Sequence, residues 1–284
     1  MAGMLRALIL VSPLLVTGCM PAAQQVRVEG VFWQPDAQTL EPHGNWDALG
    51  VHTLVVQWSM VGELGLVDGC GSREWRGDKP DWARIAAQPW AGKLIVGLAG
   101  EFDEAKARGN LPLLTERSRC VVAQRPQGNV AGWYFPVEID PAWDTAPQLA
   151  EQLRDLPRPL WVSVYDNSNV GGPALAQWLA AWLPADVGVF FQDGVGLHTR
   201  EPRVAREYMR ALRRELGTER VRLIAETFRP KGPGKGEGFR AATVDELAAQ
   251  LASYRGERVY LFEGPHYLDE AAVLALKQRL DATP

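Results

Sequence analysis

Residues 160–225 contain the pattern that decides the fold, and they read LWVSVYDNSNVGGPALAQWLAAWLPADVGVFFQDGVGLHTREPRVAREYMRALRRELGTERVRLIA. Three short runs rich in Val, Leu, Ile and Phe alternate here with two longer stretches in which apolar residues recur at helical spacing. Short apolar runs of this kind form buried strands, and the helical stretches connect one strand to the next. Strands and helices in alternation predict parallel βαβ units.

The same alternation extends over residues 28–284. Eight apolar runs predict strands at residues 28–33, 53–58, 94–98, 130–135, 160–164, 187–191, 221–225 and 259–262. Helices are predicted at residues 173–183, 204–216, 244–255 and 270–280, and Thr243 with Glu246 forms a capping box before the third. Eight βα units in a chain of this length predict an α/β fold with one domain, a (β/α)8 TIM barrel. A doubly wound open sheet is the alternative, although no nucleotide-binding signature follows any strand.

The composition excludes several classes of protein. Lys plus Arg number 30 and Asp plus Glu number 34, so the net charge of −4 argues against a nucleic-acid-binding protein. With 4 His and 3 Cys the chain is poor in metal ligands, and we expect neither a metal site nor a cofactor. The 11 Trp residues either serve as flat faces for ligands such as sugars or fill a large core.

The first residues, MAGMLRALILVSPLLVTGCM, look like a targeting signal. The sequence Val16-Thr17-Gly18-Cys19 resembles a bacterial lipobox, which implies a signal peptide over residues 1–18, cleavage before Cys19 and lipidation of its thiol. Residues 19–27 would then be a short tether, and residues 28–284 the barrel. Met20 after the cysteine favours the outer membrane, so we expect an envelope lipoprotein facing the periplasm that contacts the membrane only through its lipid. An ordinary secretory signal with a chance cysteine is the alternative.

Two cysteines remain in the mature chain, Cys70 and Cys120. Thiols in an oxidising compartment commonly pair, and both residues lie between predicted strands. They either form a structural disulfide or stay free.

Polar residues follow all eight predicted strands. In a barrel the carboxyl ends of the strands meet at one mouth, where the chemistry is done. Carboxylates and amides follow each strand here, more regularly than solvation of strand ends or helix caps would require. We expect the substrate site to be lined by Gln34, Gln57, Trp58, Tyr134, Asp140, Tyr165, Asp166, Asn167, Gln192, Asp193, Glu263 and His266.

Two of the carboxylates suggest a reaction. Cleavage of a glycosidic bond needs one carboxylic acid to protonate the leaving oxygen and one carboxylate to act as nucleophile or base. Glu138 and Glu226 follow the fourth and seventh strands, which resembles the retaining barrel glycosidases and implies Glu138 as acid/base and Glu226 as nucleophile. Val137 stands where those enzymes have Asn, so Asp140 is the alternative to Glu138. Each glutamate could equally serve in a salt bridge or a hydrogen bond at the rim.

Three stretches carry a further resemblance: GWYFPVEID at residues 132–140, FFQDGVG at 190–196 and AETF at 225–228. With GVFWQ at residues 30–34, they are similar to a bacterial barrel family, domain-of-unknown-function family 4434, which is classed as glycosidase-like. The resemblance extends over residues 28–268 and implies a glycoside hydrolase that acts on a cell-envelope or extracellular polysaccharide. The alternative is a non-catalytic glycan-binding lipoprotein of a polysaccharide export or secretion system. Its protein partners are not indicated.

Overall fold

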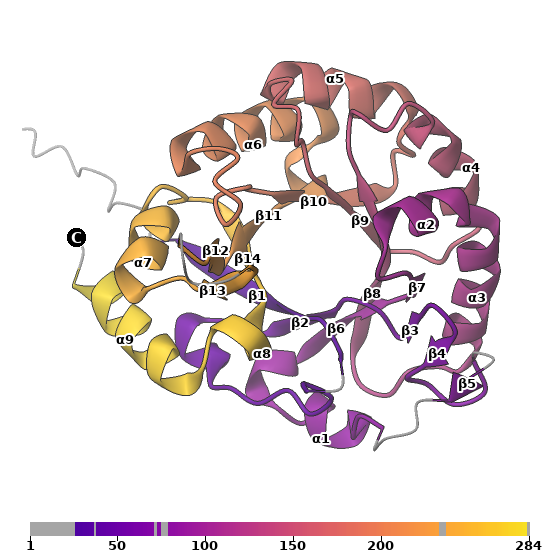
Figure 1. The fold of residues 1–284 in the computed structure, drawn as a ribbon, viewed down its shortest axis with the longest axis horizontal. Helices are drawn as coiled ribbons and strands as arrows, with labels where there is room; N and C mark the ends of the chain where they lie inside the picture. The colour runs from indigo at the N-terminus through magenta and orange to yellow at the C-terminus, as the bar shows by residue number, and fades with distance from the viewer. Residues whose placement is uncertain (1–25, 37, 71–72, 75–78, 233–236, 283–284) are drawn as a thin grey trace, which may run out of the picture.

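The structure is a computed structural model that describes residues 26–36, 38–70, 73–74, 79–232 and 237–282. Eight parallel strands close into a barrel in the order β1-β14-β11-β10-β9-β8-β6-β2, and helices surround it (Figure 1). The barrel strands are β1 (Arg27–Trp33), β2 (Thr53–Val56), β6 (Lys93–Gly97), β8 (Val130–Ile139), β9 (Leu160–Val164), β10 (Val187–Gln192), β11 (Val221–Glu226) and β14 (Arg258–Phe262). The predicted (β/α)8 barrel is confirmed, and each of the eight predicted strands corresponds to one of its strands.

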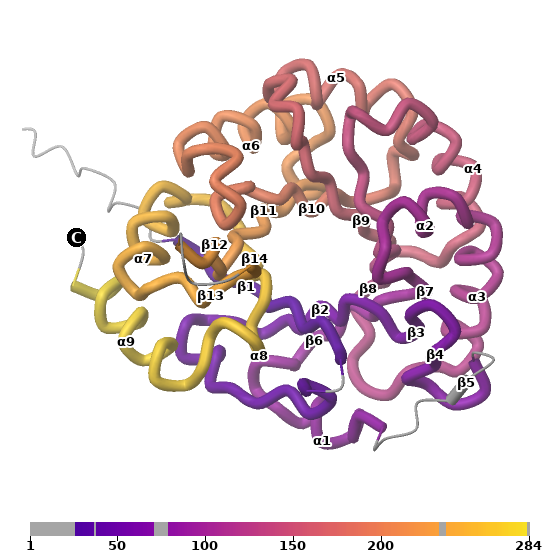
Figure 2. The backbone as a smooth tube through the Cα atoms, in the orientation of Figure 1, coloured from indigo at the N-terminus to yellow at the C-terminus, as the bar shows by residue number. Residues whose placement is uncertain are grey.

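The outer helices follow the chain once around the ring (Figure 2). They include α1 (Trp82–Ala86), α3 (Leu111–Ala123), α4 (Leu149–Arg154), α5 (Gly172–Trp182), α6 (Pro202–Leu216), α7 (Val244–Ala252) and α9 (Glu270–Asp281). Helix α6 buries one face, including Tyr208, Met209 and Leu212, and exposes arginines on the other. Helix α7 begins with the predicted capping box but ends at Ala252, because Tyr254 turns toward the barrel.

The core has two layers. Inside the barrel, a cluster of buried side chains such as Phe32, Phe190 and Tyr260 fills the lumen with aromatic rings in edge contact. A Cβ at Gly30 would lie 2.3 Å from the Tyr260 ring, so this position requires glycine. A larger apolar cluster lies between the strands and the helices. It contains Trp33, Trp46 and Trp90, each at most 1% exposed, so part of the tryptophan excess belongs to the core.

Short elements extend the carboxyl end of the barrel. A four-stranded sheet contains β3 (Met60–Val61), β4 (Leu64–Gly65), β5 (Arg73–Glu74) and β7 (Ala99–Gly100). Strands β12 (Phe228–Pro230) and β13 (Phe239–Ala241) pair as a hairpin, and α2 (Glu104–Gly109) and α8 (Gly264–Tyr267) are short helices. A disulfide joins Cys70, beside the small sheet, to Cys120 on α3.

The predicted signal peptide and lipid anchor lie outside the described residues, which begin at Val26. Within the part of the chain that the structure describes, no helix has the length and hydrophobicity needed to span a bilayer.

Candidate active site

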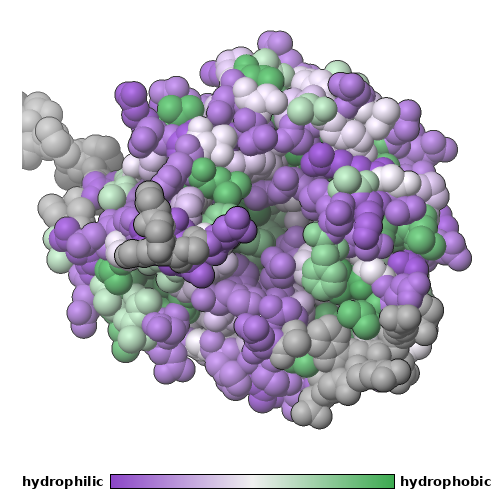
Figure 3. All heavy atoms as spheres, in the orientation of Figure 1, coloured by the Kyte–Doolittle hydropathy of each residue, from purple (hydrophilic) through white to green (hydrophobic). Residues whose placement is uncertain are grey.

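The polar residues that follow the strands gather at the carboxyl end of the barrel. Figure 3 shows this face, which is hollowed over the centre of the ring and bordered by hydrophilic side chains with hydrophobic ones between them. We refer to this hollow, bounded by the ends of the eight barrel strands and the loops after them, as the mouth.

Glu138 lies at the end of β8, where the pairing with β9 shifts register between Phe135 and Ile139. Its carboxylate oxygen Oε2 accepts a hydrogen bond of 2.6 Å from Gln192 Nε2, at the end of β10. The guanidinium of Arg108 donates to the Glu138 carbonyl at 2.9 Å. Gln192 thus fixes the side chain of Glu138 and Arg108 its backbone, while the residue stays half-buried.

A second carboxylate lies beside Glu138. The Oε2 atom of Glu104, the first residue of α2, accepts a 3.1 Å hydrogen bond from the Glu138 backbone N–H. Burial, together with the charge of Glu138, raises the pKa of Glu104 to about 7. Burial also raises the pKa of Glu138, although the hydrogen bond from Gln192 and the charge of Arg108 oppose the rise. Glu104 was not predicted as a site residue, because it follows the third predicted strand at a distance, inside a short helix.

Glu226 and Asp193 form a buried pair at the ends of β11 and β10. Their exposed fractions are 1% and 0%. The Glu226 Oε2 atom accepts a 2.6 Å hydrogen bond from the Gly196 N–H. Asp193 accepts hydrogen bonds from Val195 N at 3.1 Å, Glu226 N at 3.3 Å, and the Tyr254 hydroxyl at 2.7 Å. Two carboxyl groups are therefore buried together.

Burial is the largest of the effects that raise the pKa values of Asp193 and Glu226. It raises the pKa of Asp193, against the effect of the hydrogen bonds that Asp193 accepts. Burial and the charge of Asp193 raise the pKa of Glu226 to about 8, although the N–H groups of Gly196 and Leu197 oppose the rise. Burial therefore favours the protonated form of one of the two carboxyl groups.

Tyr165, which directly follows β9, is affected by the charges of both predicted catalytic glutamates. Its hydroxyl is hydrogen-bonded to the Thr199 hydroxyl. Burial raises the pKa of Tyr165, and the charges of both Glu226 and Glu138 raise it further. Both carboxyl groups are therefore within electrostatic range of one phenol at the mouth.

Arg200 holds the loops after β9 and β10 together. It donates hydrogen bonds to the carbonyls of Gln192, at 3.0 Å, and Asp166. Its guanidinium also lies 5.5 Å from the centre of the Tyr165 ring. Arg200 therefore positions Tyr165 and Gln192, a role that the sequence pattern did not reveal.

Three predicted site residues after β8 and β9 have other contacts. Asp166 is fully buried and its Oδ2 atom accepts a 2.8 Å hydrogen bond from the Tyr208 hydroxyl on α6, so this carboxylate lies against a helix. Asp140 accepts hydrogen bonds from the backbone N–H groups of Ala142, at 2.7 Å, and Asn167, at 3.3 Å. Asp140 thus fixes the loops, and the side chain of Asn167 is exposed.

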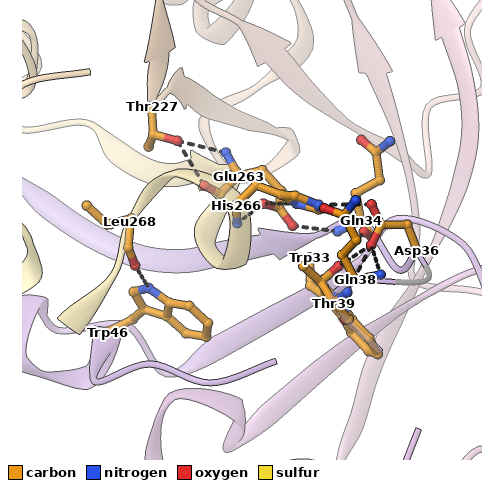
Figure 4. A network of polar contacts seen from close by, with 10 residues as sticks. All are labelled: Trp33, Gln34, Asp36, Gln38, Thr39, Trp46, Thr227, Glu263, His266 and Leu268. Atoms are coloured by element: carbon orange, nitrogen blue, oxygen red, sulfur yellow. Dashed lines mark hydrogen bonds and ion pairs between the residues drawn. The ribbon is translucent and has the colours of Figure 1, made fainter. Parts of the chain in front are cut away.

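Glu263 and His266 form a network with the loop after β1 (Figure 4). Glu263 Oε1 accepts a 2.9 Å hydrogen bond from Gln34 N, and Oε2 accepts from His266 N at 2.8 Å. The His266 ring lies between Glu263, 2.8 Å from Nδ1, and Asp36, 3.0 Å from Nε2. The hydrogen bond to Glu263 is the largest of the effects that raise the pKa of His266 to about 9, so the ring is a cation between two carboxylates. These contacts join three segments of the rim.

Tyr134 and Trp58, which were predicted to line the substrate site, are buried. Tyr134 is 2% exposed and donates a 2.8 Å hydrogen bond to Ser163, and Gln57 Oε1 is buried without a partner among the described residues. Trp58 is 4% exposed, and its ring packs edge-on against Phe102 with 5.2 Å between the centroids. Phe102 is 62% exposed, so a residue absent from the sequence prediction offers the open aromatic face.

No group of three or more His, Cys, Asp and Glu side chains suited to a metal ion occurs among the described residues. The carboxyl groups with raised pKa values offer general acid–base chemistry.

Comparisons with known proteins agree on the fold alone. No family model and no curated protein matches the chain. Among solved structures, a GH18 chitinase from Pseudoalteromonas aurantia is similar, with a TM-score of 0.52 and 12% sequence identity over 89% of this chain and 99% of that one. The chain therefore shares the TIM-barrel fold of that structure.

Proposed function

We propose that the protein is a glycoside hydrolase that acts on a cell-envelope or extracellular polysaccharide, with Glu138 and Glu226 as its carboxyl pair. The observation that carries the proposal is the presence, at one mouth, of two carboxyl groups whose pKa values are raised by burial and whose charges both act on Tyr165. Perturbed carboxyl groups in a hollow at the carboxyl end of a barrel are typical of acid–base chemistry.

The rim supports a sugar polymer as the substrate class. The exposed ring of Phe102 provides a flat apolar face of the kind on which sugar rings stack. The similar chitinase acts on a polysaccharide through a barrel of the same fold, which makes a glycan a reasonable substrate here as well. The lipobox-like start and the disulfide support a place in the cell envelope, anchored by lipid at Cys19.

One observation favours the alternative of a glycan-binding lipoprotein without activity. Glu226 is only 1% exposed, so substrate reaches at most an edge of its carboxyl group. In a binding protein this carboxyl group would fix the loop at Gly196, and the rim alone would contact the glycan.

The test is a cleavage assay with the purified full-length protein in mild detergent. A panel of bacterial exopolysaccharides and chitin oligosaccharides is incubated with the parent, Glu138→Gln and Glu226→Gln, and new reducing ends are measured. We expect each variant to lose about 10²–10⁴-fold in rate, as loss of a general acid or base does. Glu151→Gln, an exposed position on α4, is the matched control and should cleave like the parent.

The outcomes separate the two functions. Cleavage that survives both substitutions overturns the carboxyl pair. Tight binding without cleavage, measured by calorimetry on the same glycans, favours the binding lipoprotein.

A further inference from the structure

We propose that Asp193 is a positioning residue that keeps Glu226 protonated at neutral pH, so that Glu226 is the proton donor and Glu138 the anionic partner. This inference rests on the proposed function and reverses the roles that the resemblance to retaining glycosidases implies. It assigns a task to Asp193 that is distinct from lining the sugar site.

The contacts of Asp193 identify it as the anion of the pair. Its Oδ1 atom accepts from the N–H groups of Val195 and Glu226, and Oδ2 accepts from Gln250 Nε2 at 2.5 Å and the Tyr254 hydroxyl at 2.7 Å. Four donors satisfy an ionised carboxylate that is fully buried, and a protonated one would lose at least one of these bonds.

Arg229 fixes the direction of the Gln250 amide. Its Nη2 atom donates a 2.7 Å hydrogen bond to Gln250 Oε1, so the Gln250 amide nitrogen must face Asp193. The Nη1 atom of Arg229 donates to the carbonyls of Glu226, at 3.1 Å, and Phe228, at 2.7 Å. The Arg229 guanidinium is thus committed to neutral oxygens and pairs with neither Asp193 nor Glu226.

Glu226 has fewer donors than Asp193. The hydrogen bonds to its carboxyl group come from the N–H groups of Gly196 and Leu197. Charged and titratable groups face it from each side: Asp193 from β10, Tyr165 from β9, Tyr254 from the segment after α7, and Arg200 from the loop before α6. Arg200 favours ionisation, but Asp193 opposes it with a larger effect. Because two adjacent buried carboxylates cannot both ionise, the proton belongs to Glu226.

The chemical step follows from this distribution. The proton of Glu226 moves to the glycosidic oxygen, and the electron pair of the breaking carbon–oxygen bond stays on that oxygen. The positive charge that develops on the sugar faces the carboxylate of Glu138. Water then supplies a hydroxyl group to the sugar carbon and returns a proton to Glu226, which restores the starting state.

Infrared spectroscopy tests the protonation without any substrate. The full-length protein is labelled with ¹³C at its glutamate carboxyl groups, and the C=O stretch of protonated glutamate is followed from pH 5 to 10. We expect two components, one from Glu104 with a midpoint near 7 and one from Glu226 that largely persists at pH 7 and disappears with a midpoint near 8. Glu226→Gln should remove the component near 8 and leave that of Glu104, whereas Glu138→Gln should leave the component near 8.

Asp193→Asn is the decisive variant, and we expect it to lower the midpoint of the Glu226 band by about one pH unit or more. Tyr254→Phe keeps both carboxyl groups and serves if Asp193→Asn does not fold. This variant removes one hydrogen-bond donor to Asp193 and so makes ionised Asp193 less stable. Part of the proton population should then move from Glu226 to Asp193, so that the labelled glutamate band weakens and an unlabelled aspartate band appears. An absent Glu226 band at pH 7, or a band that neither variant changes, overturns the proposal.

Aryl glycosides with good leaving groups separate this inference from the proposed function. Such substrates need little protonation, so Glu226→Gln should lose at least tenfold less rate on them than on the polysaccharide. Glu138→Gln should lose rate on both. If no substrate is cleaved, the glycosidase proposal fails while the infrared result still decides the state of Glu226.

Discussion

Gly196, in the loop after β10, lies so close to Glu226 that only a residue without a side chain fits at this position. A Cβ at this position would be 2.7 Å from Glu226 Cβ and 2.8 Å from Oε2. Real Cβ atoms do not approach other atoms at such distances, so the glycine is what allows its N–H to reach the carboxyl group.

Substitution of this glycine has a predictable cost. We expect Gly196→Ala to lower the free energy of unfolding by about 1–3 kcal/mol, because the buried Glu226 has little room to move. Urea unfolding measures the change. Gly232→Ala is the control, since no atom of the described residues other than its chain neighbours lies within 4 Å of the added Cβ. We expect its stability to stay within about 0.5 kcal/mol of the parent. Equal unfolding midpoints for the two variants would contradict the steric argument.

At this scale the sequence predicted only part of the site. Glu138, Glu226 and Gln192 come at strand ends, and the alternation of strands and helices was sufficient to place them at the mouth. Glu104 and Gln250 lie on helices, and Tyr254 lies in the turn after one. Glu104 reaches Glu138, and Gln250 and Tyr254 reach Asp193, through tertiary packing. No local sequence pattern encodes these contacts.

Among the elements, the loop after β1, the end of β14 and helix α8 are joined by the ion pairs of His266. The pKa of His266 is raised from 6.5 to about 9, so its stabilising contribution is complete below pH 6.5 and is lost as the pH rises through 9. The side chain of His266 is 26% exposed, which keeps the contribution on the order of 1–2 kcal/mol.

Unfolding measured from pH 6 to 10 tests this contribution. We expect His266→Gln to be less stable than the parent at pH 6, and the difference to disappear by about pH 10, where the parent's imidazole is neutral. Other groups that titrate in this range affect both proteins equally and cancel in the difference. A difference that is constant with pH would show that the histidine acts through packing instead.

The capping box of α7 gives a second test at this scale. Thr243 Oγ1 accepts from the Glu246 N–H at 3.2 Å, and Glu246 Oε2 accepts from the Thr243 N–H at 2.7 Å. We expect Thr243→Ala to cost about 1 kcal/mol in thermal or urea unfolding, as the loss of an N-cap does. Thr243→Ser keeps the hydroxyl and should recover most of the loss. If serine is as destabilising as alanine, the hydroxyl is not the stabilising group.

Most of the long elements were predicted, with α3 as an exception, whereas the shortest ones were not. The eight barrel strands and helices α5, α6, α7 and α9 show their periodicity over five or more residues or form continuous apolar runs. Strands β3, β4, β5 and β7 have two residues each and are held by contacts with one another. Two residues show no period, so the small sheet at the rim could not be read from the sequence.

The whole molecule is stabilised by one covalent link between its rim and its outer layer. The disulfide from Cys70 to Cys120 closes a loop with a sequence separation of 50. We expect the double variant Cys70→Ser/Cys120→Ser to lose about 2–4 kcal/mol, since the link restricts the unfolded chain. Reduction of the parent with dithiothreitol should reproduce this loss and leave the double variant unchanged. An identical unfolding curve for the reduced and oxidised parent would contradict the expectation.

The contact between Trp58 and Phe102 makes the rim optically observable. The indole is 4% exposed and lies edge-on beneath a phenyl ring that is 62% exposed, so whatever covers Phe102 changes the surroundings of a shielded fluorophore. We expect oligosaccharide binding to alter the tryptophan emission, and Trp58→Phe to remove that part of the change although the chain has 11 Trp residues. Phe102→Ala should weaken the titration itself. The protein thus carries its own fluorescent reporter, with which ligands can be screened before any reaction is known.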